Sequence, residues 1–163
     1  TSTHVQPAIY NKKKKYIITF RNPIKRFISA FNWRYRLLKE KKQFKESPAI
    51  IWEIVSNISR SDWVPGVENI KLDGNKRIFK MEGMGRLVEE IIECNDENME
   101  LSYSAIETAI PIQHHLAIIK LSEMDDNTIF DWTTEIDPPE FSHAIRQGML
   151  ASLDQLEKVL KNS

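Results

Sequence analysis

The chain has 163 residues, of which 41% are hydrophobic and 28% charged, a composition typical of a soluble globular domain. It contains no apolar run of about 18 residues and starts with polar residues, so neither a membrane span nor a secretory signal peptide is predicted. The net charge of zero results from two parts of the chain with opposite charges. Residues 1–46 carry 13 Lys/Arg against 2 Glu, a net +11, and residues 47–163 carry 10 against 21 acidic residues, a net −11. This asymmetry predicts two units, a basic leader over 1–43 and a domain over 44–163.

The leader contains one informative pattern. Residues 16–20 (YIITF) predict a short buried strand. After Pro23, apolar residues recur at three- and four-residue spacing, which predicts a helix with proline in its first turn. A strand, a tight turn and a helix in this order can bind an anion at the helix N-terminus.

The stretch over residues 15–33, KYIITFRNPIKRFISAFNW, resembles the 3′-phosphate-binding segment of sulfotransferases. The resemblance implies that Arg21 and Ser29 hold a phosphate, since a guanidinium fork and a hydroxyl both suit that group. The residues before Arg21 contain no glycine, whereas the family has a glycine-rich phosphate loop there, so sulfate transfer is not expected. The alternatives are a gene-fusion remnant and a basic amphipathic helix. We expect weak contact with an anionic surface through residues 12–42 and no specific nucleic acid partner.

The domain reads as a short helix, a series of strands and a long helix. Ser47 and Pro48 are a helix start, as N-cap and first helical residue, and the amphipathic pattern continues to Ser59. A charged segment over 38–45 is a candidate edge strand. Strands are predicted over 68–72, 77–82, 86–94, 99–107, 114–124 and 128–137, and a long amphipathic helix over 140–161.

This order predicts an α+β fold in which a curved antiparallel sheet wraps around the long C-terminal helix and leaves a cavity between them. The domain resembles the START-like (SRPBCC) superfamily of helix-grip proteins, which includes Bet v 1-type proteins, polyketide cyclase/dehydrase and lipid-transport domains, and abscisic-acid receptors. The resemblance covers about residues 44–163 and rests on the segments SPAxxW from Ser47, WxPGV from Trp63, LSYS from Leu101, and LxxL from Leu153. A cystatin-like cone is the competing fold.

The alternation of side chains along strands selects the residues that face the cavity. With the register that the resemblance implies, the candidate ligand-binding residues are Glu89, Tyr103, His115, Phe130, Trp132, Gly148 and Ser152. Glu89 is the anchor or acid/base candidate, although a slip of one residue would turn Glu90 inward instead. Gly148, inside a helix, either makes room for a ligand or allows close packing.

The predicted function is binding of a small hydrophobic molecule, such as a lipid, quinone or polyketide-like compound, by a carrier or sensor. The alternatives are an aromatase/cyclase-type enzyme and a sulfotransferase-related fusion. Too few inward acid/base groups are present to favour an enzyme, and no catalytic residue, cofactor or metal site is predicted. Lys71 is the only lysine of the early strand, which disfavours a carboxylate ligand of the abscisic-acid type. The lone Cys94, expected as a small buried residue, suits a reducing, cytoplasmic setting. The sequence leaves the oligomeric state open.

Overall fold

The computed structural model describes residues 35–163, and the chain divides into the units Thr1–Trp33 and Arg34–Ser163. The phosphate-binding prediction for Arg21 and Ser29 lies outside the described residues. Within residues 35–163, no helix is both long enough and apolar enough to cross a membrane.

The second unit consists of one antiparallel sheet with helices on one side. Its strands follow the order β1-β7-β6-β5-β4-β3-β2, so that every consecutive pair from β2 to β7 is a hairpin neighbour. The elements are β1 (Arg36–Phe44), α2 (Pro48–Val55), β2 (Val67–Asp73), β3 (Lys76–Met81), β4 (Gly85–Asn95), β5 (Glu100–Glu107), β6 (His114–Met124), β7 (Asn127–Asp137), the 3₁₀ turn η1 (Pro139–Phe141) and α3 (Ser142–Lys161). The predicted α+β helix-grip fold is confirmed.

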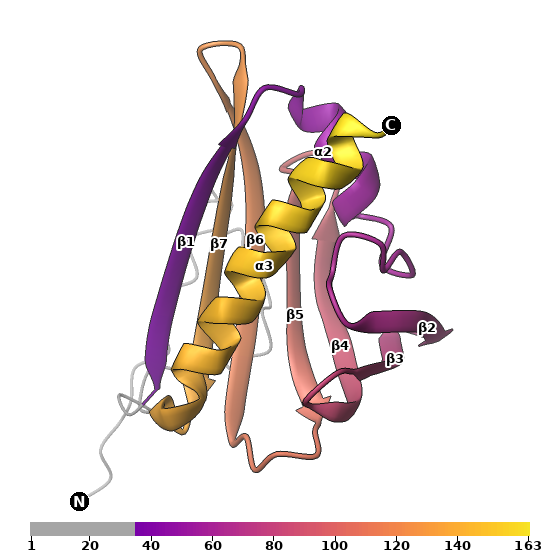
Figure 1. Cartoon of the computed structure of the whole chain (residues 1–163), viewed down its shortest axis with the longest axis vertical. Coiled ribbons are helices and arrows are strands. Elements are labelled where there is room, and N and C mark those ends of the chain that lie inside the picture. The colour runs from indigo at the N-terminus through magenta and orange to yellow at the C-terminus, as the bar shows by residue number, and fades with distance from the viewer. Residues whose placement is uncertain (1–34) are drawn as a thin grey trace, which may run out of the picture. The chain divides into compact units, whose positions relative to one another are not determined.

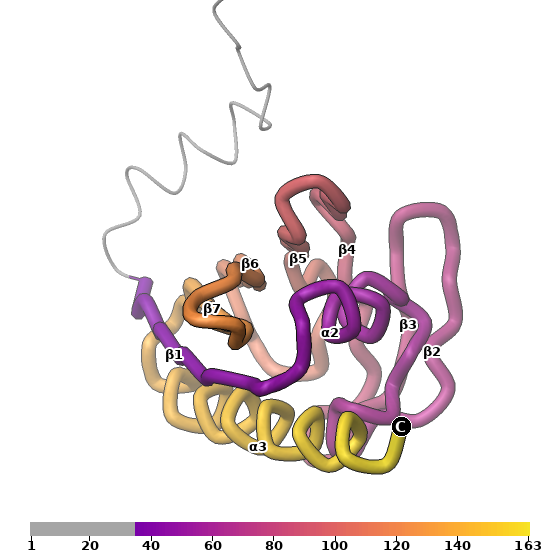
Figure 2. The backbone as a smooth tube through the Cα atoms, turned by 90° about the horizontal axis from the view of Figure 1, so that it is seen from above, coloured from indigo at the N-terminus to yellow at the C-terminus, as the bar shows by residue number. Residues whose placement is uncertain are grey.

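The sheet curves around the helices. Figure 1 shows α3 lying diagonally across the sheet, with β1 beside one edge and the β2–β3 hairpin at the other. Seen from above, the strands bend around α2 while α3 closes the open side (Figure 2). The concave face is therefore covered by two helices of very different length.

The first strand belongs to the sheet although it is rich in charge. It pairs with β7 along its full length, from Arg36 opposite Ile136 to Phe44 opposite Thr128. Leu38 and Phe44 point into the core, whereas Lys39 and Lys41 point outward; Glu40 and Lys42 share the inward face with the two apolar residues. The sheet thus starts ahead of the boundary expected at residue 44, and the candidate edge strand is confirmed.

Ion pairs attach α3 to β1. Lys42 Nζ lies 2.8 Å from a carboxylate oxygen of Asp154 and 2.8 Å from one of Glu157. In the middle of the strand, Arg146 Nε lies 2.5 Å from Glu40 Oε1. The charges on the inward face of β1 are therefore used to hold the helix.

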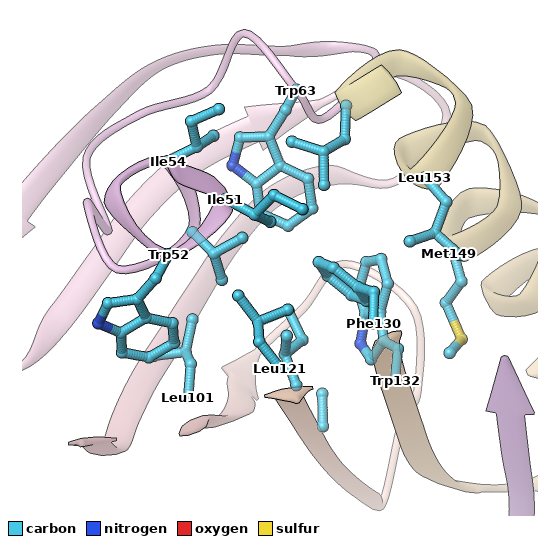
Figure 3. Close-up of a cluster of buried hydrophobic side chains, with 14 of the residues drawn as sticks. Ile51, Trp52, Ile54, Trp63, Leu101, Leu121, Phe130, Trp132, Met149 and Leu153 are labelled. Carbon is cyan, nitrogen blue, oxygen red and sulfur yellow. The ribbon is translucent and has the colours of Figure 1, made fainter. Parts of the chain in front are cut away.

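The short helix α2 fills one end of the concave face. Its residues Ile51, Trp52 and Val55 are buried against the sheet, where Leu101 and Phe130 lie in the same apolar cluster (Figure 3). Nε1 of Trp52 donates a hydrogen bond to Asp96 Oδ1 at 2.8 Å, which satisfies the polar atom of this core residue. Apolar side chains therefore fill this end of the concave face.

Some details differ from the sequence-based expectations. The helix α2 ends at Val55 rather than near Ser59, with Ser56 as its C-cap, where both the backbone N–H and the hydroxyl of Ser56 donate to the Trp52 carbonyl. Cys94 is exposed rather than buried, near the end of β4. The long helix is preceded by a 3₁₀ turn, since Pro138 is extended and Pro139 starts that turn.

Candidate functional site

A cavity of about 160 Å³ lies between the concave face of the sheet and α3. It occupies the part of that face that α2 leaves uncovered. Most of its wall is apolar, with contributions from Trp63, Val64, Pro65, Val67, Ile70, Phe79, Met81, Met84, Leu87, Ala105, Ile112, Ile145 and Met149. The polar lining residues are Arg60, Arg77, Glu89, Tyr103, His115, Trp132, Thr134 and Ser152. An apolar wall with a few polar groups is the usual make-up of a small-molecule site.

Six of the seven predicted ligand-binding residues line this cavity, namely Glu89, Tyr103, His115, Trp132, Gly148 and Ser152. Phe130 does not. It is fully buried, and its ring centroid lies 6.1 Å from that of Trp132, within the cluster that α2 covers. Inward orientation alone placed it in the predicted site, because the sequence does not show which part of the inward face a helix fills.

Gly148 lies at the mouth of the cavity. It is exposed, and a Cβ built on it would meet no atom within 4 Å. Ala144 and Ala151, one turn away on either side, also line the cavity and are exposed. Small side chains therefore leave an opening along this face of α3, and the close-packing alternative for Gly148 is wrong. Ser152 is buried below it and donates a hydrogen bond to the Gly148 carbonyl at 2.8 Å.

The residue that sequence reasoning missed is Arg77. Its Nε donates to Glu89 Oε2 at 2.5 Å, and the two side chains are only 11% and 10% exposed. Its guanidinium carbon also lies 4.5 Å from the ring centroid of Tyr103, within cation–π distance. Burial alone would lower the pKa of Arg77, but the adjacent Glu89 carboxylate raises it, so the cavity contains a neutralised ion pair.

The hairpin register contains the signal that would have found this pair. The strands β3 and β4 are joined by a turn centred on Gly83, and counting outward from that turn places Arg77 opposite Glu89. The residue opposite an inward carboxylate on the neighbouring strand is therefore the first candidate for its ion-pair partner.

His115 is a neutral hydrogen-bond donor to the cavity. Its Nδ1 accepts a hydrogen bond from the Ala105 backbone N–H at 3.0 Å, which places the proton of the neutral ring on Nε2. Burial lowers the pKa of His115 to about 4, so the ring is uncharged at neutral pH. With its proton on Nε2, the neutral ring can donate a hydrogen bond to a ligand.

Trp132 brings a second donor to the same wall. Its side chain is 6% exposed, and its buried Nε1 has no hydrogen-bond partner among the described residues. The Tyr103 hydroxyl is a neighbour of this nitrogen but does not reach it in hydrogen-bonding geometry. Burial first, and then the nearby Glu89, raise the pKa of Tyr103, so its hydroxyl keeps its proton. Figure 3 shows Trp132 with Trp63 and Met149 around it.

These groups can bind and orient a ligand. Within the described part of the chain, no cluster of three His, Cys, Asp or Glu residues could hold a metal ion. Lys71, the early-strand lysine, is exposed and lies outside the cavity lining. The buried cation of the site is instead Arg77, and it already faces a carboxylate.

Solved structures share this fold. The chain is similar to the protein XoxI from Bacillus cereus, at 19% identity and a TM-score of 0.70, covering 76% of this chain and 94% of that one. A Thermobifida fusca protein matches at 24% identity and a TM-score of 0.66, covering 74% and 90%. Ara h 8.0201 matches at 11% identity and a TM-score of 0.67, covering 79% and 99%.

At these identities the structural likeness shows the fold alone. No curated protein matches the chain in sequence. A family model does match, over residues 37–161, from the second residue of β1 to the end of α3. On this match, the chain belongs to the polyketide cyclase / dehydrase and lipid transport family.

Proposed function

We propose that the protein binds a small hydrophobic molecule in the cavity between the sheet and α3, as a carrier or sensor. The observation that supports this most directly is the cavity itself, about 160 Å³ of space with a largely apolar wall. Membership of a family that includes lipid transport agrees with the proposal. Gly148, Ala144 and Ala151 form an opening through which a ligand can enter.

The polar groups favour binding over catalysis. A general base must be free to accept a proton from the substrate. The Glu89 carboxylate is held by Arg77 at 2.5 Å, and the acceptor nitrogen of His115 is occupied by the Ala105 backbone N–H. Trp132 Nε1–H and His115 Nε2–H are donors, which hold a ligand oxygen without removing a proton.

The proposal is tested by titrating the full chain with N-phenyl-1-naphthylamine, an uncharged probe whose fluorescence rises in apolar surroundings. We expect a saturable increase with one probe per chain. Native mass spectrometry of the protein purified from its own cells then gives the mass of any bound compound. Absence of saturable probe binding would contradict the proposal. Conversion of the recovered compound by fresh protein would show the cyclase-type alternative instead.

A further inference from the structure

The cavity wall contains a donor that the protein leaves unused. Nε1 of Trp132 is buried, belongs to the lining and has no acceptor among residues 35–163. A buried N–H without a partner costs free energy, which a bound acceptor recovers. His115 Nε2–H lies in the same wall, and both groups can only donate in their neutral states. These donors therefore favour a ligand that supplies an acceptor atom.

The charges of the site oppose an ionised ligand. Arg77 and Glu89 cancel each other at 2.5 Å. Arg60, the other lining cation, is paired at the rim with Asp62 at 2.7 Å. A ligand carboxylate would meet the Glu89 carboxylate with no unpaired cation to compensate it, and burying an unpaired charge is costly. An ammonium group would face the N–H donors, which repel it.

The cavity volume limits the part of the ligand that is enclosed. At about 160 Å³, it is close to an engineered protein cavity of about 150 Å³ that binds benzene. One ring with a small substituent therefore fills it. The wall includes the aromatic side chains of Trp63 and Trp132, whose ring centroids are 6.0 Å apart. A folded acyl chain would leave the indole N–H unpaired.

Resting on the proposed function, we infer that the ligand places an uncharged ring in the cavity, with a carbonyl or ether oxygen that accepts a hydrogen bond from Trp132 Nε1. This selects oxygenated cyclic compounds from the wider class of hydrophobic molecules. Acyl chains and carboxylates are disfavoured for the two reasons given above.

Acetophenone and α-methylstyrene test the inference, because they share one shape and differ in a carbonyl oxygen against a methylene group. The full chain, labelled with ¹⁵N, is titrated with each while the indole N–H resonances of its 4 tryptophans are followed by NMR. We expect acetophenone to shift the Trp132 resonance downfield and to bind about tenfold tighter, the effect of one hydrogen bond to a buried donor. Benzoate, the charged relative, should bind more weakly than acetophenone.

Trp132→Phe identifies the Trp132 resonance by its loss and should remove most of the preference for the carbonyl compound. Trp63→Phe is the matched control, since it changes another buried aromatic residue of the same wall and should leave the preference intact. If Trp132→Phe does not fold, the comparison of acetophenone with α-methylstyrene in the wild-type protein still tests the inference.

Equal binding of acetophenone and α-methylstyrene, or tighter binding of benzoate, would overturn the inference and leave the proposed function standing. If neither compound nor N-phenyl-1-naphthylamine shifts any resonance of the cavity residues, both the inference and the proposed function fail.

Discussion

Replacing Gly148 with leucine should block the cavity while making the domain more stable. A Cβ at this position meets no atom within 4 Å, so the new side chain enters open space at the mouth. Removing a glycine from a helix interior contributes about 1 kcal/mol. Because the site is exposed, about half of the leucine side chain becomes buried, which adds about 0.8–1.5 kcal/mol, and fixing its rotamer costs about 0.5–1 kcal/mol. The free energy of unfolding should rise by about 1–2 kcal/mol in total.

The assay combines urea denaturation with titration of N-phenyl-1-naphthylamine. Gly148→Ala separates the two effects, because it supplies the helix propensity but only one carbon atom, so it should stabilise by about 1 kcal/mol and retain most binding. Gln147→Leu is the control for an added leucine on α3, since Gln147 is exposed and lies outside the cavity lining. It should leave probe affinity unchanged.

Two results would refute this reasoning. A loss of about 1–3 kcal/mol in Gly148→Leu is the cost of overpacking and would mean that the space at the mouth is not open. Unchanged probe affinity in a stable Gly148→Leu variant would place the binding site elsewhere in the molecule.

Three further predictions concern the ion pair, the buried histidine and the first strand. Arg77→Met leaves Glu89 buried without its partner and should lower the free energy of unfolding, measured by urea denaturation, by about 3–5 kcal/mol. The double variant Arg77→Met/Glu89→Leu should recover most of this loss. A double variant as unstable as the single one would contradict the prediction. Between pH 6.5 and about 4, the unfolded chain binds a proton at His115 that the folded chain does not. The free energy of unfolding should therefore fall by about 3 kcal/mol as the pH falls through this range. Above pH 6.5, protonation of His115 should not affect the free energy of unfolding. His115→Asn should remove that part of the pH dependence, and an unaltered slope would show that other groups cause it. A chain starting at Arg34 should show a cooperative transition in thermal unfolding. A chain starting at Ser47 lacks the buried Leu38 and Phe44, so its free energy of unfolding should be lower by about 4 kcal/mol, or its cooperative transition should be absent.

The order of elements could be predicted because each left a local signal. Strand alternation, the turn residues after Leu72 and the two prolines after Asp137 marked the hairpins and the last strand. The first strand was harder, because its charges hide two apolar residues whose burial depends on pairing with β7, a contact distant in sequence.

The residues that face inward from the sheet could be predicted, but the sequence did not show which of them line the cavity and which belong to the core. Alternation along a strand gives the side that a residue faces, whereas the position of α2 decides that Phe130 is core and Trp132 is cavity wall. Arg77 was missed for a different reason: its partner Glu89 was considered one strand at a time, and the pair emerges only from the register between strands. The signal was present in the turn centred on Gly83.

The ion pairs of α3 bear on how a ligand exchanges. Among residues 35–163, the ion pairs between α3 and the sheet all run to β1, and none runs to β2 or β3. The helix is thus fastened along one edge, and its other edge borders the mouth with glycine and alanine. The β2–β3 hairpin has no ion pair to α3, and the contacts that hold it to the sheet are the β3–β4 ladder and the Arg77–Glu89 pair. Ligand exchange past this edge should therefore depend on the hairpin and its bonds to β4, and a change in salt concentration that weakens the ion pairs of α3 with β1 should act on the opposite edge of the helix.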